Sequence, residues 1–211
     1  RYPQLAPISG RVRTLAYNSE RLSAADLPDD IMALADSDLS VGWAPAYGAF
    51  QSFVTAMRLL EGDDATLAWL KAMQPNAQEY AGELGAVLAA SQGEVDLSLA
   101  NHYYTLRLKA GQPEAKVDLA FTRNDAGSLV NTSGVAVLKP GDTAHDFIRY
   151  LLSREVQGYL AREAYELPLV PEVPTPDALP AMDRIQPPEI DLTRLGDLQP
   201  TLDLMRRAGV L

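Results

Sequence analysis

Residues 96–104, Asp-Leu-Ser-Leu-Ala-Asn-His-Tyr-Tyr, decide the fold and hold the first candidate site. The first half alternates polar and apolar side chains, which predicts a β-strand. The residues from Tyr103 to Lys109 follow a helical pattern, and Asn101 is placed to cap that helix. Open α/β sheets bind ligands where strands end and helices begin, so two consecutive tyrosines at this junction are candidate ligand-binding residues. The alternative for such a pair is packing in the core or on the surface.

The composition excludes several classes of protein. The 211 residues are 47% hydrophobic and 22% charged, which is typical of a globular chain. The net charge of −10 argues against nucleic-acid binding, because phosphate contacts need an excess of Lys and Arg. No apolar run reaches the length of about 18 residues that a membrane span needs. The sequence contains no Cys and 2 His, which disfavours thiol nucleophiles and zinc sites.

Apolar periodicity predicts an α/β fold in which strands alternate with helices. The expected strands are residues 12–17, 41–44, 95–99, 117–121, 129–130 and 135–138. The expected helices are residues 30–35, 49–60, 63–73, 83–92, 103–109 and 144–161, and a last helix with Pro200 in its first turn. The segment between Tyr165 and Glu189 contains prolines at 168, 171, 174, 176, 180, 187 and 188, which predicts an extended strap.

Tyr103 and Tyr104 are suited to a highly charged cation. A phenol keeps its proton at neutral pH, because its usual pKa is about 10. A small trivalent ion such as Fe³⁺ displaces that proton and prefers anionic oxygen ligands. The turn from strand to helix allows both phenol oxygens to converge on one ion. A ferric site is therefore one function that this pair can serve.

The helix start at Tyr47, Gly48 and Ala49 is a second candidate site. Its backbone N–H groups and the helix dipole favour an anion, and Gly48 allows the anion to approach closely. Carbonate or phosphate bound there can fill metal positions that the phenolates leave open. The alternative is an ordinary helix start that contains a glycine. Asn101 either donates its amide to the same anion or serves only as the cap of its own helix.

Each of three further residues allows two interpretations of its role. Glu83 either stabilises the start of its helix or faces a ligand cleft. His102 is either a neighbour of the tyrosines or a direct metal ligand. Arg11 either neutralises an anion or flanks the first strand.

Segments spread over most of the chain resemble one known family. They are, in order, SGRVR at 9–13 with YN at 17–18, VGWAP at 41–45 with GAF at 48–50, WLK at 69–71, GEVD at 93–96, NHYY at 101–104 and SGVAVL at 133–138. Together they resemble the periplasmic ferric-ion-binding proteins of ABC iron-uptake systems, which belong to the type II periplasmic solute-binding proteins. The combination is far more specific than any single segment.

The resemblance implies a two-lobed, non-catalytic protein of the periplasm that closes on Fe³⁺ and delivers it to an inner-membrane ABC permease. Tyr103 and Tyr104 match the family's ferric-binding tyrosines, Tyr47, Gly48 and Ala49 fall on the segment that holds a synergistic anion (carbonate or phosphate), and Asn101 matches an anion-contacting asparagine. Glu83, His102 and Arg11 are further candidates for the surroundings of this site. The sequence begins without an apolar signal core, so we expect any export signal to have been removed. The alternative is a related binding protein whose tyrosines line a pocket for a small anion or organic acid. An enzyme is disfavoured, because the sequence lacks a Gly-x-Ser-x-Gly motif.

The sequence also departs from the family pattern. Tyr47 stands where many members carry a small hydroxyl residue, and Glu83 where some carry an asparagine. Members are longer at the N-terminus by roughly a lobe. We therefore expect residues 1–9 to lie near the hinge, 10–127 to form the ligand-binding lobe, and 128–211 to form the crossing back and the helical part of the other lobe. The apolar face of the helix at 144–161 then needs a partner, either a missing N-terminal lobe or another copy of the chain.

Overall fold

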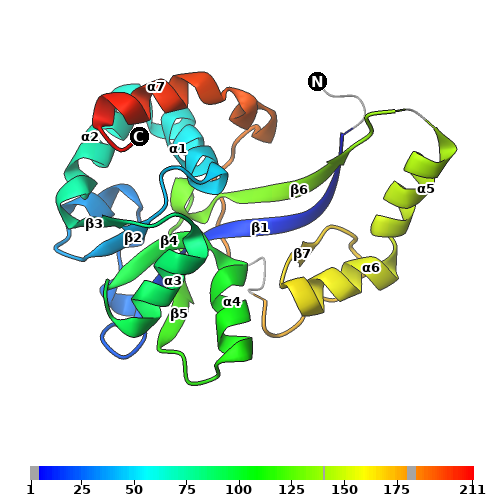
Figure 1. Cartoon of the computed structure of the whole chain (residues 1–211), viewed down its shortest axis with the longest axis horizontal. Helices are drawn as coiled ribbons and strands as arrows, with labels where there is room; N and C mark the ends of the chain where they lie inside the picture. Colours follow the sequence, from blue (N-terminus) through cyan, green and yellow to red (C-terminus); the bar gives the residue numbers. More distant parts are fainter. Residues whose placement is uncertain (1–4, 140, 180–183) are drawn as a thin grey trace. The chain divides into compact units, whose positions relative to one another are not determined.

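The chain forms two compact units in the computed structural model, which describes residues 5–139, 141–179 and 184–211. The smaller unit comprises the described residues within 1–11 and 130–184, and the larger unit comprises 12–129 and 185–211. The chain passes between them after Arg11, after Leu129 and before Ile185. Figure 1 labels the helices and strands of both units.

The larger unit is built on a mixed sheet with the strand order β3-β2-β4-β1-β5. These strands are β1 Leu5–Asn18, β2 Val41–Trp43, β3 Ala77–Glu79, β4 Leu97–Asn101 and β5 Val117–Ala120. β1 is antiparallel to β4 and β5, whereas β2 is parallel to β3 and β4. The predicted strand at 12–17 is longer than expected, because it continues into the smaller unit, and β3 is too short to have been predicted from its pattern. The predicted α/β class is confirmed, and the sheet is mixed.

Helices pack on this sheet in two groups. They are α1 Gly48–Glu61, α2 Asp63–Met73, α3 Glu83–Gln92, α4 His102–Gly111 and α7 Leu198–Ala208. Helices α1, α2 and α7 contact one another, while α3 contacts α4, β2 and β4. The helix predicted at 30–35 is instead a 3-10 turn, Met32–Asp36. Gly62 has a φ of +88° and separates α1 from α2, as only a residue without a Cβ does at low cost.

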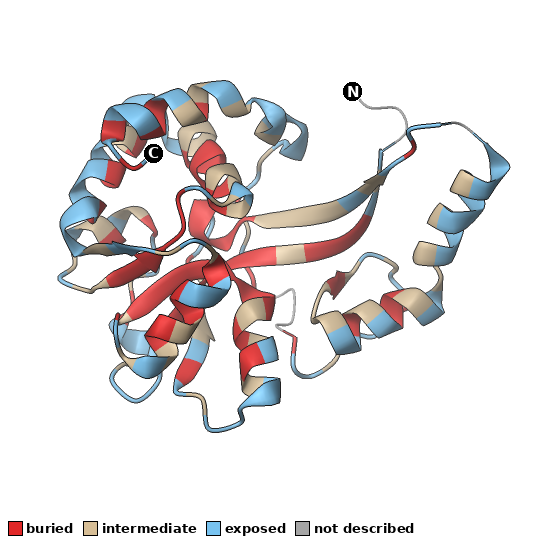
Figure 2. Ribbon diagram, viewed as in Figure 1, coloured by how far each residue is buried: buried red, intermediate tan, exposed pale blue. Residues whose placement is uncertain are grey.

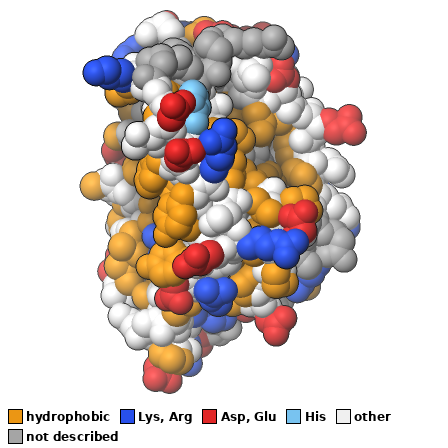
Figure 3. Space-filling model, turned by 90° about the vertical axis from the view of Figure 1, so that its right-hand side faces the viewer, with side chains coloured by type: hydrophobic (Ala, Val, Ile, Leu, Met, Phe, Trp, Pro, Cys, Tyr) orange, Lys and Arg blue, Asp and Glu red, His pale blue; other side chains and the backbone are white. Residues whose placement is uncertain are grey.

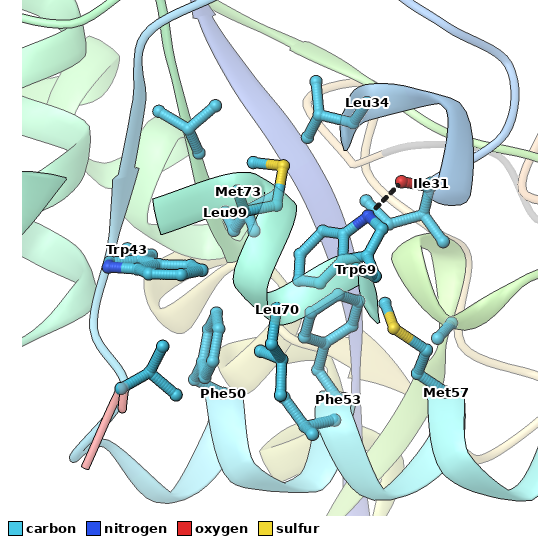
Figure 4. Close-up of a cluster of buried hydrophobic side chains, with 14 of the residues drawn as sticks. Ile31, Leu34, Trp43, Phe50, Phe53, Met57, Trp69, Leu70, Met73 and Leu99 are labelled. Atoms are coloured by element: carbon cyan, nitrogen blue, oxygen red, sulfur yellow. Dashed lines mark hydrogen bonds between the residues drawn. The ribbon is translucent and has the colours of Figure 1, made fainter. Parts of the chain in front are cut away.

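The core of the larger unit is aromatic at its centre (Figure 4). Phe50 and Phe53 of α1 lie between Trp43 of β2 and Trp69 of α2, with successive ring centroids 5.6, 5.5 and 5.8 Å apart. The indole Nε1 of Trp69 donates a hydrogen bond of 2.8 Å to the backbone oxygen of Ile31. These aromatic contacts, edge to face at both tryptophans, fix α1 and α2 against the sheet, and thereby fix the start of α1 next to the end of β4.

The last helix belongs to the larger unit, which corrects the expectation that all of 128–211 goes with the other lobe. Helix α7 packs against α1 and α2 and buries Thr201, Leu204, Met205 and Ala208. Leu204 and Met205 are part of the same core cluster as Phe50. The amphipathic pattern predicts that this helix buries one face, but it contains no information about which neighbours cover that face.

The smaller unit contains the first half of β1, paired with β6 Val130–Ala136 and β7 Leu167–Pro168. Its helical elements are α5 Asp142–Leu151, α6 Arg154–Tyr159 and a π-helical turn at Leu160–Ala164. The single helix predicted at 144–161 is therefore wrong. The helix breaks because the hydroxyl of Ser153 accepts the N–H of Val156 at 3.4 Å and begins α6.

Two other predictions concern this unit. A single strand, β6, takes the place of the two strands predicted at 129–130 and 135–138, and it includes neither Leu129 nor residues 137–138. The described residues 169–179 form neither helix nor strand, as the prolines predict. Pro180, and residues 181–183 of the same segment, lie outside the described residues.

Helices α5 and α6 expose an apolar face. α5 has no buried residue, and Phe147, Tyr150 and Tyr159 are 54%, 55% and 58% exposed. Figure 2 draws α5 without buried positions, and Figure 3 shows hydrophobic side chains gathered on this side of the molecule. This face is therefore exposed in the described part of the chain. None of the helices in the described part of the chain is long and apolar enough to cross a membrane.

Candidate functional site

Strand β4 passes into helix α4 without an intervening loop (Figure 1). Asn101 is the last residue of β4 and also the N-cap of α4, and Tyr103 and Tyr104 lie in the first turn of the helix. The predicted strand-to-helix junction is therefore confirmed. The side chain of Asn101 makes no capping hydrogen bond, which corrects that part of the prediction. Its amide bonds to a tyrosine of the same junction instead.

Three tyrosine side chains meet at this junction. The hydroxyl of Tyr47 lies 2.9 Å from the hydroxyl of Tyr104. The rings of Tyr103 and Tyr104 lie side by side, with centroids 4.6 Å apart. The amide of Asn101 donates to the hydroxyl of Tyr103 at 3.2 Å. Burial raises the pKa of Tyr104 above its usual value, and the hydroxyls of Tyr47 and Tyr103 raise it further, so this phenol is neutral at physiological pH.

A buried ion pair holds the junction between β4 and α4 in place. The carboxylate of Glu83, at the start of α3, pairs with the guanidinium of Arg13 in β1, and both side chains are almost fully buried. The other carboxylate oxygen of Glu83 accepts the backbone N–H of Asn101 at 2.9 Å. Arg13 also lies over the ring of Phe53, 5.4 Å from its centroid. Glu83 thus fixes the end of β4 rather than facing an open cleft.

His102 is fully buried next to the tyrosines. Its Nδ1 accepts the backbone N–H of Val12 in β1 at 3.2 Å. Its ring meets the ring of Tyr103 edge to face, with centroids 5.6 Å apart. Because Nδ1 is occupied by a backbone donor, that nitrogen does not face the three hydroxyls.

The start of α1 lies beside the same cluster. Tyr47 is the N-cap of α1, and its side chain reaches Tyr104 instead of capping the helix. Gly48 is exposed, and a Cβ built on it meets no atom within 4 Å, so the space at the helix start is open. The first N–H groups of a helix have no partner within the helix, which leaves those near Gly48 and Ala49 to bind an anion or water.

Arg11 belongs to the smaller unit, where its guanidinium donates to Ser133 at 3.1 Å. Arg107 was not predicted; its guanidinium carbon lies 4.7 Å from the centroid of the Tyr103 ring. The signal for Arg107 was its helical spacing of one turn from Tyr103. The ion pair of Arg13 with Glu83 joins residues far apart in the sequence, so no local pattern indicates it.

The chemistry of this cluster is that of an oxygen-donor site. Among the described residues, no three His, Cys, Asp or Glu side chains come together to hold a metal ion. The hydroxyls of Tyr47, Tyr103 and Tyr104 are the oxygen atoms that converge instead. Neutral phenols become strong ligands only for a cation charged highly enough to displace their protons. Converging phenol oxygens of this kind therefore suit a trivalent cation.

Comparisons with known proteins extend over most of the chain. A family model described as "Bacterial extracellular solute-binding protein" matches residues 2–191. The major ferric iron-binding protein of Neisseria meningitidis serogroup B is 33% identical over 211 residues, which cover 96% of this chain and 64% of that protein. The Fe(3+)-binding periplasmic protein of Serratia marcescens is 33% identical over 214 residues, which cover 97% of this chain and 63% of that protein.

A solved structure agrees with these relatives. Iron-bound HitA from Pseudomonas aeruginosa matches with a TM-score of 0.90 and 32% identity, over 98% of this chain and 69% of that one. The type II periplasmic-binding-protein fold implied by the sequence resemblance is thereby confirmed. The chain spans 64% of the length of its Neisseria relative. By fold and by the extent of the family match, the chain belongs to the family of bacterial extracellular solute-binding proteins.

Proposed function

We propose that this chain binds ferric iron, without catalysis, as part of the solute-binding component of an ABC iron-uptake system. The observation that carries the proposal is the cluster of hydroxyls from Tyr47, Tyr103 and Tyr104, in a chain similar to ferric iron-binding proteins of Neisseria and Serratia. Tyr103 and Tyr104 provide phenolate ligands to Fe³⁺. Two phenolates cancel two of the three charges of the ion and leave other coordination positions open.

Tyr47 acts together with this pair. Its hydroxyl is already 2.9 Å from that of Tyr104, so little movement brings its oxygen to an ion bound there. A cation that displaces the protons of both hydroxyls into solvent then contacts both oxygens. Asn101 holds the Tyr103 hydroxyl through its amide, which orients that ring before iron arrives.

The synergistic anion, carbonate or phosphate, binds at the start of α1. Support for this position comes from the open space at Gly48 and from the N–H groups of the first helical turn near Ala49. The amide of Asn101 is a further donor proposed for the anion. To reach the anion, this amide turns away from the Tyr103 hydroxyl. Glu83 and His102 stay in the supporting layer below, and Arg11 lies in the smaller unit.

The wider setting is also a proposal. We place the protein in the periplasm, where it passes iron to an inner-membrane permease, as expected for its family. The exposed apolar face of α5 and α6 includes a groove of ≈ 500 Å³ lined by Tyr150, Val156 and Tyr159. Further polypeptide of the same protein, or another copy of the chain, covers this face in the complete binding protein. Light scattering as a function of protein concentration distinguishes a self-associating chain from a monomer.

The test is a ferric titration of the metal-free protein, in competition with a soluble chelator. We expect a visible phenolate-to-iron charge-transfer band that saturates at about one iron per chain. The variants Tyr103→Phe and Tyr104→Phe should each bind iron more weakly and give a weaker band, because each removes one phenolate and leaves the ring in place. Tyr17→Phe is a matched control, since Tyr17 lies in β1 and forms no part of the cluster. Repeating the titration with carbonate, with phosphate and with neither anion identifies the anion.

Two outcomes would contradict the assignment of Tyr103 and Tyr104 as ferric ligands. A band as intense in both variants as in the wild type would show that iron binds elsewhere. If the protein binds an organic acid in the absence of iron and shows no charge-transfer band when iron is added, a pocket for small anions lined by the same tyrosines would be favoured.

A further inference from the structure

The chain crossing into the larger unit is bonded to the residues that precede the tyrosine pair. Val12 is the first residue of the larger unit, in a strand that continues into the smaller unit. Its backbone N–H donates to Nδ1 of His102 at 3.2 Å, within a fully buried environment. His102 is the first residue of α4 and is followed directly by Tyr103. One side chain therefore connects the crossing strand with the base of the candidate site.

The next residue of the strand, Arg13, is also connected to the end of β4. Arg13 is the register partner of Asn101 in the β1–β4 ladder, and its guanidinium pairs with Glu83, which also holds the Asn101 N–H. The backbone N–H of Arg13 donates to the carbonyl oxygen of Leu129 at 3.0 Å. Leu129 is the last residue of the larger unit before the chain crosses back. Both crossings thus meet the segment that ends in the tyrosine pair.

His102 has the geometry of a residue that transmits position. Its ring is held at Nδ1 by the crossing strand and packs edge to face on Tyr103, with centroids 5.6 Å apart. A movement of the start of α4, such as the adjustment that brings phenol oxygens onto a cation, therefore changes the hydrogen bond to Val12. Interiors packed in this way respond by shifting between arrangements rather than by absorbing the strain locally.

We propose that His102 is a positioning residue that couples cation binding at Tyr103 and Tyr104 to the conformation of the strand at the unit crossing. The inference rests on the proposed ferric function and adds the device by which the bound ion is sensed at the crossing. Its chemical requirement is an acceptor at the position of Nδ1. An asparagine side chain places an oxygen close to that position, whereas a leucine fills the volume without an acceptor.

The experiment compares the wild-type chain with His102→Asn and His102→Leu. Amide hydrogen exchange of Val12 and Arg13 is measured with and without ferric iron, and ferric affinity is measured by chelator competition. In the wild-type chain, iron should slow exchange at the Val12 amide. His102→Leu should speed that exchange in the metal-free protein, abolish its response to iron and weaken ferric binding about tenfold. His102→Asn should restore the response and bind iron within about threefold of wild type.

The outcomes separate this inference from the function on which it rests. If the wild-type chain binds no iron, the proposed function fails and the coupling fails with it. If wild type and His102→Leu bind iron equally, with the same response at Val12, only the coupling is overturned. Equal losses of affinity in His102→Asn and His102→Leu also overturn it, because the acceptor would then not be what matters. A merely structural role would lower the melting temperature of His102→Leu and leave the iron response at Val12 intact.

Discussion

Replacement of Glu83 by glutamine tests how the base of the site is held together. Glutamine keeps an oxygen for the Asn101 N–H but removes the charge that faces Arg13. The side chains of Glu83 and Arg13 are 0% and 5% exposed, so water cannot take the place of the lost carboxylate. Removing one member of a buried ion pair costs about 3–5 kcal/mol of unfolding free energy, because it leaves an uncompensated buried charge. We expect Glu83→Gln to fall in that range.

The assay is equilibrium unfolding in urea, with the midpoint and slope compared between variants. Asp203→Asn is the control, because its ion pair with Arg206 is exposed and should contribute less than about 1 kcal/mol. The double variant Arg13→Met with Glu83→Gln should be more stable than the sum of the single losses predicts, since it leaves no unpaired charge. A loss below about 1 kcal/mol for Glu83→Gln would refute the reasoning, because the pair would then be hydrated or dispensable.

Further predictions concern the tyrosines, the last helix and pH. Tyr47→Phe should weaken ferric binding with little change in fold, as chelator competition and circular dichroism can show, because it removes the hydroxyl 2.9 Å from Tyr104. Ferric affinity should rise with pH between about 6 and 9 in chelator competition, since iron displaces phenol protons. The pKa of Tyr104 is raised in the folded state, so its contribution to stability is present below about pH 10 and is lost as pH rises. Above that pH, the unfolding free energy of the wild type, measured in urea, should fall by up to about 1.4 kcal/mol per pH unit relative to that of Tyr104→Phe. Leu204→Ala should cost about 2–5 kcal/mol by urea unfolding, because Leu204 is 2% exposed in the core; a loss near zero would mean that α7 is not docked.

Much of the larger unit follows from local pattern. The alternation in residues 95–99 and the helical spacing from Phe50 to Leu60 are strong signals, because each buries one continuous face. The glycine at 93, with a φ of +75°, marks the end of α3 where a left-handed residue is required. The placement of α7 beside α1 and α2 could not be predicted from the local pattern, because an amphipathic face does not specify its neighbours. The break at Ser153 was hidden by apolar residues that continue the helical pattern on both sides of it.

For the candidate site, the sequence indicates which side chains have suitable chemistry but not which of them are in contact. Two adjacent tyrosines at the end of a strand are visible in the sequence, and so is the glycine at the start of α1. The contact between Tyr47 and Tyr104 depends on how α1 packs beside β4, which no local pattern records. The burial of Glu83 with Arg13 is likewise a tertiary contact between distant segments. Sequence reasoning therefore identifies which side chains have the right chemistry, and packing decides which of them meet.

Resonance Raman spectroscopy of the iron-loaded protein tests the central claim most directly. Excitation in the visible charge-transfer band enhances only the vibrations of ligands bound to the metal. Protein prepared with ring-deuterated tyrosine should show enhanced phenolate ring modes that shift on deuteration, and these modes should weaken in Tyr103→Phe and in Tyr104→Phe. An iron-loaded protein without enhanced tyrosine modes, or with modes unchanged in both variants, would contradict the assignment of these tyrosines as ferric ligands.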